Sequence, residues 1–269
     1  MSHSNVFQET ISLTFSSSVE NHKGMEIITS KDADGTGFSY DLCSQLCKRY
    51  QGELIHLNDL LPEELRGKSE DACVVIFRNG VRNILQIDPD ALLREQTALV
   101  WDSKMLNKGK VMNKNARHNL CYADFAQEAD YAVGKGTVFD FSDVRLQHLR
   151  GTRAAIGQAF GFEKLLAEGN RYYNAKKCYI GFHGDTERAQ VFCLRLGATF
   201  PIYYQWYHRF APLGELAKID LHHGDIYIMS EKAVGCDWKK SSQLTLRHAA
   251  GDPKVIMPLV KKAQAKCEK

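Results

Sequence analysis

The chain has 269 residues, of which 44% are hydrophobic and 25% are charged. This composition is typical of a globular protein with a sizeable core, and it excludes a disordered, collagen-like or coiled-coil chain. The longest apolar stretches are far shorter than the roughly 20 residues of a membrane-spanning helix, and the N-terminus has no signal-peptide pattern. We therefore expect a soluble intracellular protein, cytoplasmic or nuclear, with no membrane association.

Charge and cysteine content restrict the function only loosely. The chain has 35 Lys and Arg against 32 Asp and Glu, a net charge of +3 that leaves room for a local basic groove. Its eight cysteines are scattered through apolar segments, without the close spacing of a small disulfide-rich domain. This pattern indicates reduced thiols in an intracellular compartment.

The first hundred residues predict a small α+β unit. Residues 10–15 alternate with period two and predict a strand, and residues 39–50 have a helical pattern. Residues 71–77 predict a second strand, and the turn-forming pair Asn79-Gly80 suggests that residues 81–87 return as a hairpin. Residues 101–119 are basic and rich in asparagine, as in an exposed loop or a flap over a substrate.

The remainder is dominated by short strands. A helical pattern covers residues 141–161, and strands are then predicted at 178–182, 191–196, 202–206, 225–229 and 243–247. Strands at this spacing with no helices between them favour an antiparallel sandwich or jelly roll over a parallel sheet. The fold class is therefore mainly β with some α.

The most informative motif is a His-x-Asp pair at the end of an apolar strand. In extended backbone, residues i and i+2 face the same side, so His183 and Asp185 converge on one point. One imidazole and one carboxylate are two thirds of the 2-His-1-carboxylate set that binds iron(II) on one face. This pair predicts a metal site.

Three further motifs stand in a fixed order around this pair. Asn170-Arg171-Tyr172 precedes it, a Gly-Asp turn at 224–225 opens a later apolar strand, and residues 243–247 (QLTLR) end at Arg247. In this order and spacing the sequence resembles the AlkB family of iron(II)- and 2-oxoglutarate-dependent oxygenases, with their Asn-x-Tyr, His-x-Asp, L-x-x-G-D and N-L-T-F-R motifs. The resemblance covers residues 117–251, about half of the chain.

The resemblance implies a fold, ligands and a reaction. It implies a double-stranded β-helix (jelly roll) over residues 96–269, preceded by the α+β extension of residues 1–95, whose role it leaves open. His183 and Asp185 would bind iron, Asn170 and Tyr172 would hydrogen-bond 2-oxoglutarate, and Arg247 would bind one of its carboxylates. A guanidinium suits that last role because it is always charged and binds carboxylate through two parallel hydrogen bonds.

Two positions depart from the family pattern. The family carries its distal iron-binding histidine in a pattern like D-W-x-H, but residues 237–240 are Asp-Trp-Lys-Lys, so Lys240 stands at that position. Ser241 stands where the family has a second arginine. A charged ammonium is repelled by iron(II), so another residue completes the triad, or two side chains hold the metal, or the metal is lost.

Three residues are candidates for the missing ligand. They are His248, Glu231 and His223. His248 follows Arg247 on the predicted strand, so it faces away from the site if Arg247 points inward. His223 lies in a turn whose counterpart in metal-binding relatives is not a ligand, and nothing in the sequence supports Glu231.

The sequence therefore supports two functional hypotheses. The first is an iron(II)/2-oxoglutarate-dependent oxygenase that hydroxylates a C–H bond. The resemblance implies a methylated nucleic-acid base as its substrate, whose N-methyl group leaves as formaldehyde. The alternative is a catalytically inactive jelly-roll module that binds nucleic acid or a protein partner, and Lys240 and Ser241 are its main support.

Overall fold

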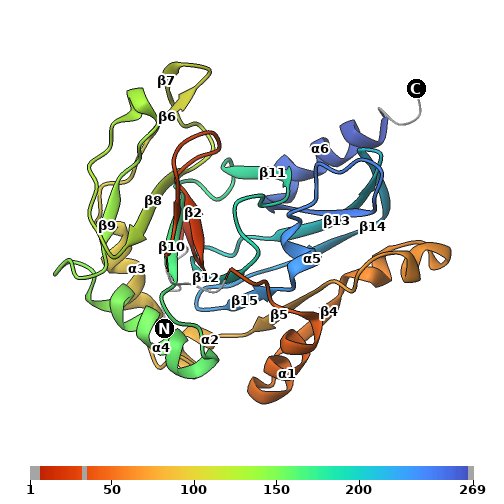
Figure 1. The fold of residues 1–269 in the computed structure, drawn as a ribbon, viewed down its shortest axis with the longest axis horizontal. Coiled ribbons are helices and arrows are strands. Elements are labelled where there is room, and N and C mark those ends of the chain that lie inside the picture. Colours follow the sequence, from red (N-terminus) through yellow and green to blue (C-terminus); the bar gives the residue numbers. More distant parts are fainter. Residues whose placement is uncertain (1–6, 32–34, 266–269) are drawn as a thin grey trace, which may run out of the picture.

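The fold is known from a computed structural model, which describes residues 7–31 and 35–265 (Figure 1). The described part is mainly β. Its sixteen strands are β1 Thr10–Ser16, β2 Ser18–Glu20, β3 Ile27–Thr29, β4 Glu53–His56, β5 Cys73–Phe77, β6 Lys104–Asn107, β7 Lys110–Asn113, β8 His118–Ala123, β9 Val138–Asp140, β10 Leu166–Tyr172, β11 Tyr179–His183, β12 Val191–Gly197, β13 Ile202–His208, β14 Ala211–Ile219, β15 Ile226–Met229 and β16 Thr245–Gly251.

Helices are fewer and lie mainly outside the sheets. The α-helices are α1 Tyr40–Tyr50, α2 Gly80–Asn83, α3 Pro89–Thr97, α4 Gln147–Phe160, α5 Glu231–Val234 and α6 Pro253–Ala265, and three short 3₁₀ helices cover Leu57–Leu60, Glu63–Lys68 and Tyr131–Val133. No helix in the described ranges combines the length and apolar character needed to cross a bilayer.

Two sheets form the body of the protein. The large sheet has the strand order β4-β5-β15-β12-β1-β10-β8-β9, and the small sheet has the order β11-β16-β13-β14. Along the chain, β10, β12 and β15 belong to the large sheet, while β11, β13, β14 and β16 belong to the small one. The chain therefore passes repeatedly from one sheet to the other, and neighbouring strands pair antiparallel except for β8 and β9.

The N-terminal strand β1 lies at the centre of the large sheet. It pairs with β10 on one side, where Thr10 faces Tyr172, and with β12 on the other, where Thr10 faces Gly197. Strands β4 and β5 extend the same sheet through β15. Three strands of the N-terminal region, β1, β4 and β5, therefore belong to the sheet that carries β10, β12 and β15.

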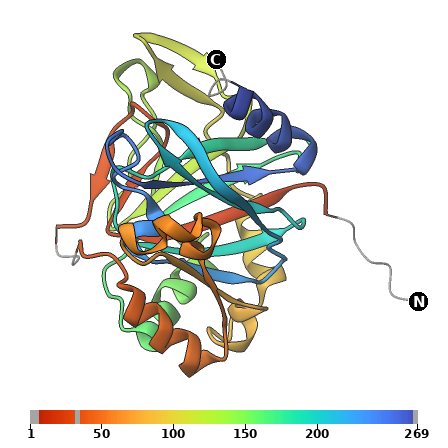
Figure 2. The same cartoon turned by 90° about the vertical axis from the view of Figure 1, so that its right-hand side faces the viewer.

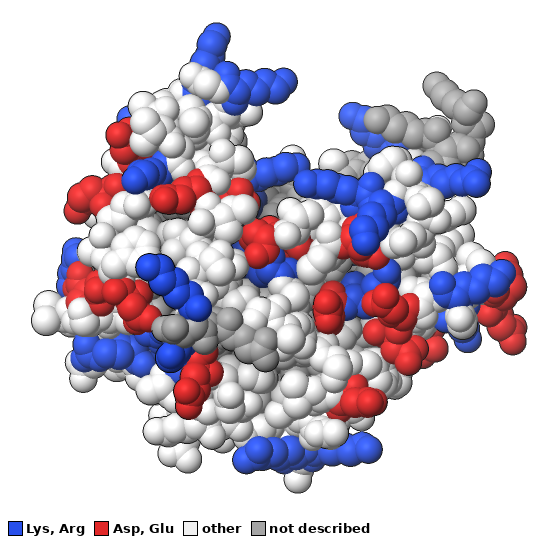
Figure 3. Space-filling model, viewed as in Figure 1, with Lys and Arg blue, Asp and Glu red and all other residues white. Residues whose placement is uncertain are grey.

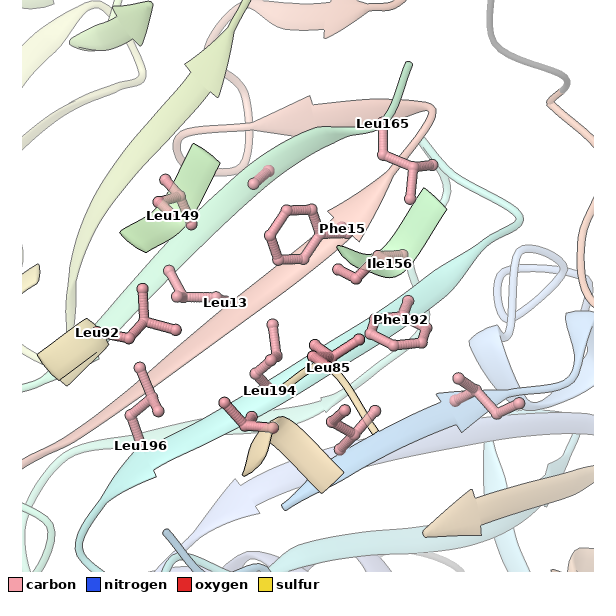
Figure 4. Close-up of a cluster of buried hydrophobic side chains, with 14 of the residues drawn as sticks. Leu13, Phe15, Leu85, Leu92, Leu149, Ile156, Leu165, Phe192, Leu194 and Leu196 are labelled. Atoms are coloured by element: carbon pink, nitrogen blue, oxygen red, sulfur yellow. The ribbon is translucent and has the colours of Figure 1, made fainter. Parts of the chain in front are cut away.

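The predicted alternation of β1 decides which side chains face the core. Ile11, Leu13 and Phe15 are fully buried against α3 and α4 on one face of the sheet (Figure 4), whereas Ser12 and Thr14 face a cavity on the other. Each large apolar side chain buried in this way contributes roughly 1.5–3 kcal/mol. The strand thus connects the main core to the cavity wall.

A second core fills the space between the two sheets. Trp206 and Leu246 from the small sheet meet residues of β5, β12 and β15, and the Trp206 indole Nε1 donates to Leu57 O at 2.7 Å. On the outer face of the small sheet, Ile256 and Val260 of α6 pack on neighbouring strands (Figure 2). The small sheet is thereby covered on both faces.

Most predicted elements are confirmed, but the hairpin after residue 77 is wrong. Asn79 adopts a left-handed conformation (φ 50°) and begins helix α2, and its backbone N–H donates to Asp225 Oδ1 at 2.9 Å. Strand β5 pairs instead with β4 and with β15, about 150 residues away. The basic segment expected to be a loop contains the β6–β7 hairpin.

Candidate metal centre

Two neighbouring strands of the small sheet bring three metal-ligating side chains together. β11 ends at His183, which lies directly opposite His248 of β16, and Asp185 follows two residues later. Asp185 Oδ1 lies 3.4 Å from His183 Nε2 and 3.8 Å from His248 Nε2. One ligand atom from each of the three residues lies within 4.8 Å of the other two. The cluster is therefore a 2-His-1-carboxylate set.

Hydrogen bonding fixes the orientation of the His183 ring. Its Nδ1 lies 2.8 Å from Gly181 O and 3.1 Å from His248 O. Because carbonyl oxygens only accept hydrogen bonds, Nδ1 carries a proton, and Nε2 is the ring nitrogen turned toward Asp185. Such a backbone contact is the usual support of a metal-binding histidine.

The electrostatic environment keeps His248 and Asp185 in their metal-binding protonation states. Burial, and to a smaller extent His183, lower the pKa of His248 to about 4, so its imidazole is neutral at physiological pH. Burial acts to raise the pKa of Asp185, but Arg188 and the two imidazoles outweigh it, and that pKa lies below its usual range. A neutral imidazole and an ionised carboxylate are the forms that bind metal.

Arg188 stabilises the ionised carboxylate. Its Nε lies 3.6 Å from Asp185 Oδ2, and its Nη2 bonds both Glu187 Oε1, at 2.7 Å, and Glu168. The guanidinium is almost fully buried, and these carboxylates compensate its charge. Arg188 therefore connects the metal cluster to the wall of the cavity formed by β10.

The loop that carries Asp185 is packed tightly against the segment after α5. The backbone N–H of Asp185 donates to Val234 O at 3.1 Å. A Cβ atom at Gly184 would lie 2.0 Å from Gly235 O and 2.9 Å from Trp238 Cδ1. Only glycine fits at this position, because the opposing atom is backbone.

Gly184→Ala is therefore expected to displace the two ligands that flank it. We expect a loss of stability of about 1–3 kcal/mol from overpacking and metal binding at least about tenfold weaker. Gly181→Ala is the matched control, because no atom lies within 4 Å of its added Cβ. Urea unfolding and manganese(II) titration of the two variants measure both effects, and equal behaviour would contradict the packing argument.

The cluster opens into a cavity of about 410 Å³ between the two sheets. Asn170 and Tyr172, predicted from the sequence, line this cavity on β10. The Asn170 Oδ1 atom accepts from Arg117 Nε at 2.6 Å and from Asn119 Nδ2 at 2.7 Å, and its Nδ2 donates to Glu168 Oε1. The Asn170 amide thus uses both lone pairs of its oxygen and one of the two hydrogens of its nitrogen.

Arg247 is not among the residues that line this cavity. Its guanidinium lies 4.0 Å from the centre of the Tyr207 ring and 5.2 Å from that of Trp238. Adjacent residues of a strand point to opposite faces, so the inward orientation of His248 turns Arg247 outward. The structure therefore does not bring Arg247 together with His183 and Asp185.

The structure also places the remaining candidate positions away from His183 and Asp185. Lys240 and Ser241 are exposed, in the turn before β16, and neither lines the cavity. Glu231 is exposed at the start of α5, and the His223 imidazole Nε2 lies 3.3 Å from Asp90. Of the three candidates for the missing ligand, the structure places only His248 beside His183 and Asp185.

One residue of the cavity was missed by sequence reasoning. Arg195 of β12 is 1% exposed and lines the cavity beside Ser12, which accepts a hydrogen bond from its Nη1. Among the described residues, no carboxylate lies within 4.0 Å of its guanidinium, and its Nε has no partner. The signal was a single charge inside the otherwise apolar strand Val191–Gly197.

Comparison with known proteins places the chain in a family without assigning a reaction. No family model matches the chain. It is 41% identical over 254 residues to "Uncharacterized protein R156" of Acanthamoeba polyphaga mimivirus, in an alignment that covers 93% of this chain and 98% of the viral one. Because the alignment takes in nearly all of both chains, the relationship extends over both sheets. The chain belongs to the same family as this mimivirus protein.

Proposed function

We propose that the protein is an iron(II)/2-oxoglutarate-dependent oxygenase that hydroxylates a C–H bond. The observation that carries this proposal is the placement of His183, Asp185 and His248 at the wall of a cavity between two sheets. Two imidazoles and one carboxylate match the donor set of iron(II) oxygenases. When bound, iron(II) and 2-oxoglutarate would activate dioxygen, which is the oxidant: one oxygen atom would enter the C–H bond, and the other would enter the succinate formed as 2-oxoglutarate loses carbon dioxide.

The cavity also has the charge that a dicarboxylate requires. Arg195 keeps a buried guanidinium without a carboxylate partner among the described residues, and a buried unpaired charge is costly unless a ligand compensates it. We assign to Arg195 the role of binding a 2-oxoglutarate carboxylate, with Ser12 holding its guanidinium in place. This assignment replaces Arg247.

Tyr172 and Asn170 have different roles in this proposal. Burial raises the pKa of Tyr172, so its hydroxyl stays protonated and can donate to a carboxylate in the cavity. Asn170 Oδ1 accepts from Arg117 and Asn119, so we assign it the positioning of Arg117. Its Nδ2 donates one hydrogen to Glu168 and keeps a second that can be donated to 2-oxoglutarate. The protein thereby binds and orients the cosubstrate in a site shielded by both sheets.

We further propose that the two sheets form a double-stranded β-helix. The seven strands from β10 to β16 pass between the sheets in the manner of a jelly roll, and β1, paired with both β10 and β12, supplies an eighth. On this view the oxygenase core includes the N-terminal strand, and Ser12 and Thr14 of that strand form part of the cavity wall.

A methylated nucleic-acid base remains the substrate implied by the resemblance to AlkB-like proteins. The alternative of an inactive binding module depended on Lys240, which lies exposed outside the cavity, whereas His248 stands at the cluster. The enzyme is therefore the better supported of the two functions.

The test is iron binding and 2-oxoglutarate turnover by the purified chain. After anaerobic reconstitution with iron(II), we expect one equivalent of bound metal and, once oxygen is admitted, formation of succinate from 2-oxoglutarate. A chain that binds no iron(II), manganese(II) or 2-oxoglutarate would be a binding module.

Substitutions of Lys240 test whether the third metal ligand is His248, as the structure indicates, or the residue at position 240, as the order of the motifs suggests. Because the Lys240 side chain is exposed and outside the cavity, we expect Lys240→Ala and Lys240→His to change manganese(II) affinity by less than about twofold. Titration calorimetry measures this. Tighter binding by Lys240→His alone would return the third ligand to position 240.

A further inference from the structure

Two segments far apart in the sequence meet at the mouth of the cavity. Lys23 comes from the turn between β2 and β3, whereas Trp238 and Lys239 follow α5, and all three line the cavity. The Nζ atoms of Lys23 and Lys239 lie 5.5 and 5.7 Å from the centre of the Trp238 ring. In Figure 3, lysine and arginine side chains stand next to aspartate and glutamate side chains near the centre of the view.

The cations around this indole lack acidic partners. Within the described ranges, no carboxylate oxygen lies within 4.0 Å of Lys23, Lys239 or Arg247, the third cation beside the ring. Arg188, deeper in the same cavity, has three carboxylates within that distance. Arg188 is thus paired with carboxylates, whereas the ammonium groups of Lys23 and Lys239 have no carboxylate oxygen within 4.0 Å among the described residues.

Trp238 also has an unused donor. Its indole Nε1 is buried and has no hydrogen-bond partner among the described residues, a situation that costs roughly 1–3 kcal/mol unless a ligand or water completes it. Two ammonium groups without a carboxylate partner beside a flat indole ring suit an anion attached to a planar ring. Lysine is a frequent phosphate ligand, and an indole face stacks on nucleobases of any kind.

We propose that Lys23, Trp238 and Lys239 form a phosphate-binding site at the mouth of the cavity. The two ammonium groups bind the phosphate, and the indole contacts the ring that carries it. The inference rests on the proposed function in one respect, since the phosphate would belong to the molecule whose C–H bond reaches the metal centre. Its source is either a free nucleotide or the backbone of a nucleic-acid chain.

The experiment measures binding without metal or 2-oxoglutarate, so its failure is distinguishable from failure of the proposed function. The probes are adenosine 5′-monophosphate and a five-nucleotide oligothymidylate, titrated into the full chain at fixed ionic strength. The double variant Lys23→Gln/Lys239→Gln is expected to bind both probes roughly tenfold or more weakly. Lys48→Gln/Lys68→Gln removes the same charge from exposed lysines outside the cavity and is expected to bind as wild type.

The two probes distinguish the sources of the phosphate. Equal affinities indicate a free nucleotide, whereas tighter binding of the oligonucleotide indicates a chain. In the latter case the double variant lowers the slope of log affinity against log salt by about 1.4, or about 0.7 for each lost contact. Equal weakening by both double variants would overturn the site, and so would equally strong competition by a glutamate pentapeptide, which carries no phosphate.

Discussion

His248→Gln is expected to weaken iron(II) binding by more than about 100-fold and to abolish 2-oxoglutarate turnover. Changes to residues that only support a metal ligand cost roughly 10–100-fold, and His248 is assigned here as a ligand itself. Glutamine keeps much of the volume of the imidazole, so the packing of β16 is preserved. Anaerobic titration with iron(II) and measurement of succinate formation give the two results.

A second histidine variant and a measurement of stability serve as controls for His248→Gln. His183→Gln removes the cross-strand partner of His248 and is expected to behave in the same way, because each imidazole supplies one of three ligands. Urea unfolding of the metal-free variants shows whether the fold is intact. If His248→Gln folds normally and binds iron(II) as wild type does, the cluster is not the metal site.

The proximity of His183 and Asp185 could be predicted from their spacing at the end of a strand. β11 ends at His183, and Asp185 lies in the loop that follows, where packing against residues 234–235 holds it. The identity of the proposed third ligand depends on which side chains of β16 point into the cavity. A shift of one residue in the alternation exchanges the inward and outward side chains. The sequence motif assigned the inward face to Arg247, whereas the structure assigns it to His248.

The role of the first strand could not be predicted for a different reason. The alternation of residues 10–15 shows that they form a strand with one apolar face, and this is confirmed. Its neighbours β10 and β12 lie more than 140 residues later, and pairing over such separations leaves no local pattern. Ser12 therefore gave no sign, in the sequence, of its contact with Arg195.

Arg195 was recognisable in principle. A single arginine in a strand whose seven residues are all buried is unusual, because charged side chains are almost never fully buried without a partner. Sequence reasoning favoured Arg247 because a family motif ended there. The same criterion also marks Arg247, because all seven residues of β16 are buried as well. What distinguishes the two arginines is the lining of the cavity, which includes Arg195 and not Arg247.

Arg195→Met is expected to weaken 2-oxoglutarate binding by ten- to more than a hundredfold. Hydrogen bonds to a charged group contribute about 1.5–3 kcal/mol, and 1.4 kcal/mol corresponds to a tenfold change in affinity. Titration of 2-oxoglutarate in the presence of manganese(II) measures the effect. Arg195→Lys keeps the charge but not the planar fork, so it is expected to restore affinity only in part.

The free energy of unfolding and a matched variant, Arg247→Met, distinguish cosubstrate binding by Arg195 from a purely structural role. The guanidinium is buried without a carboxylate partner among the described residues, so its replacement by an apolar side chain of similar length should leave the free energy of unfolding unchanged or raise it. A structural ion pair would show the opposite sign. Arg247→Met, on the outward face of β16, is expected to leave 2-oxoglutarate affinity unchanged. If Arg247→Met loses affinity while Arg195→Met keeps it, the cosubstrate is bound as the family motif predicts, and the inward face of β16 is misassigned.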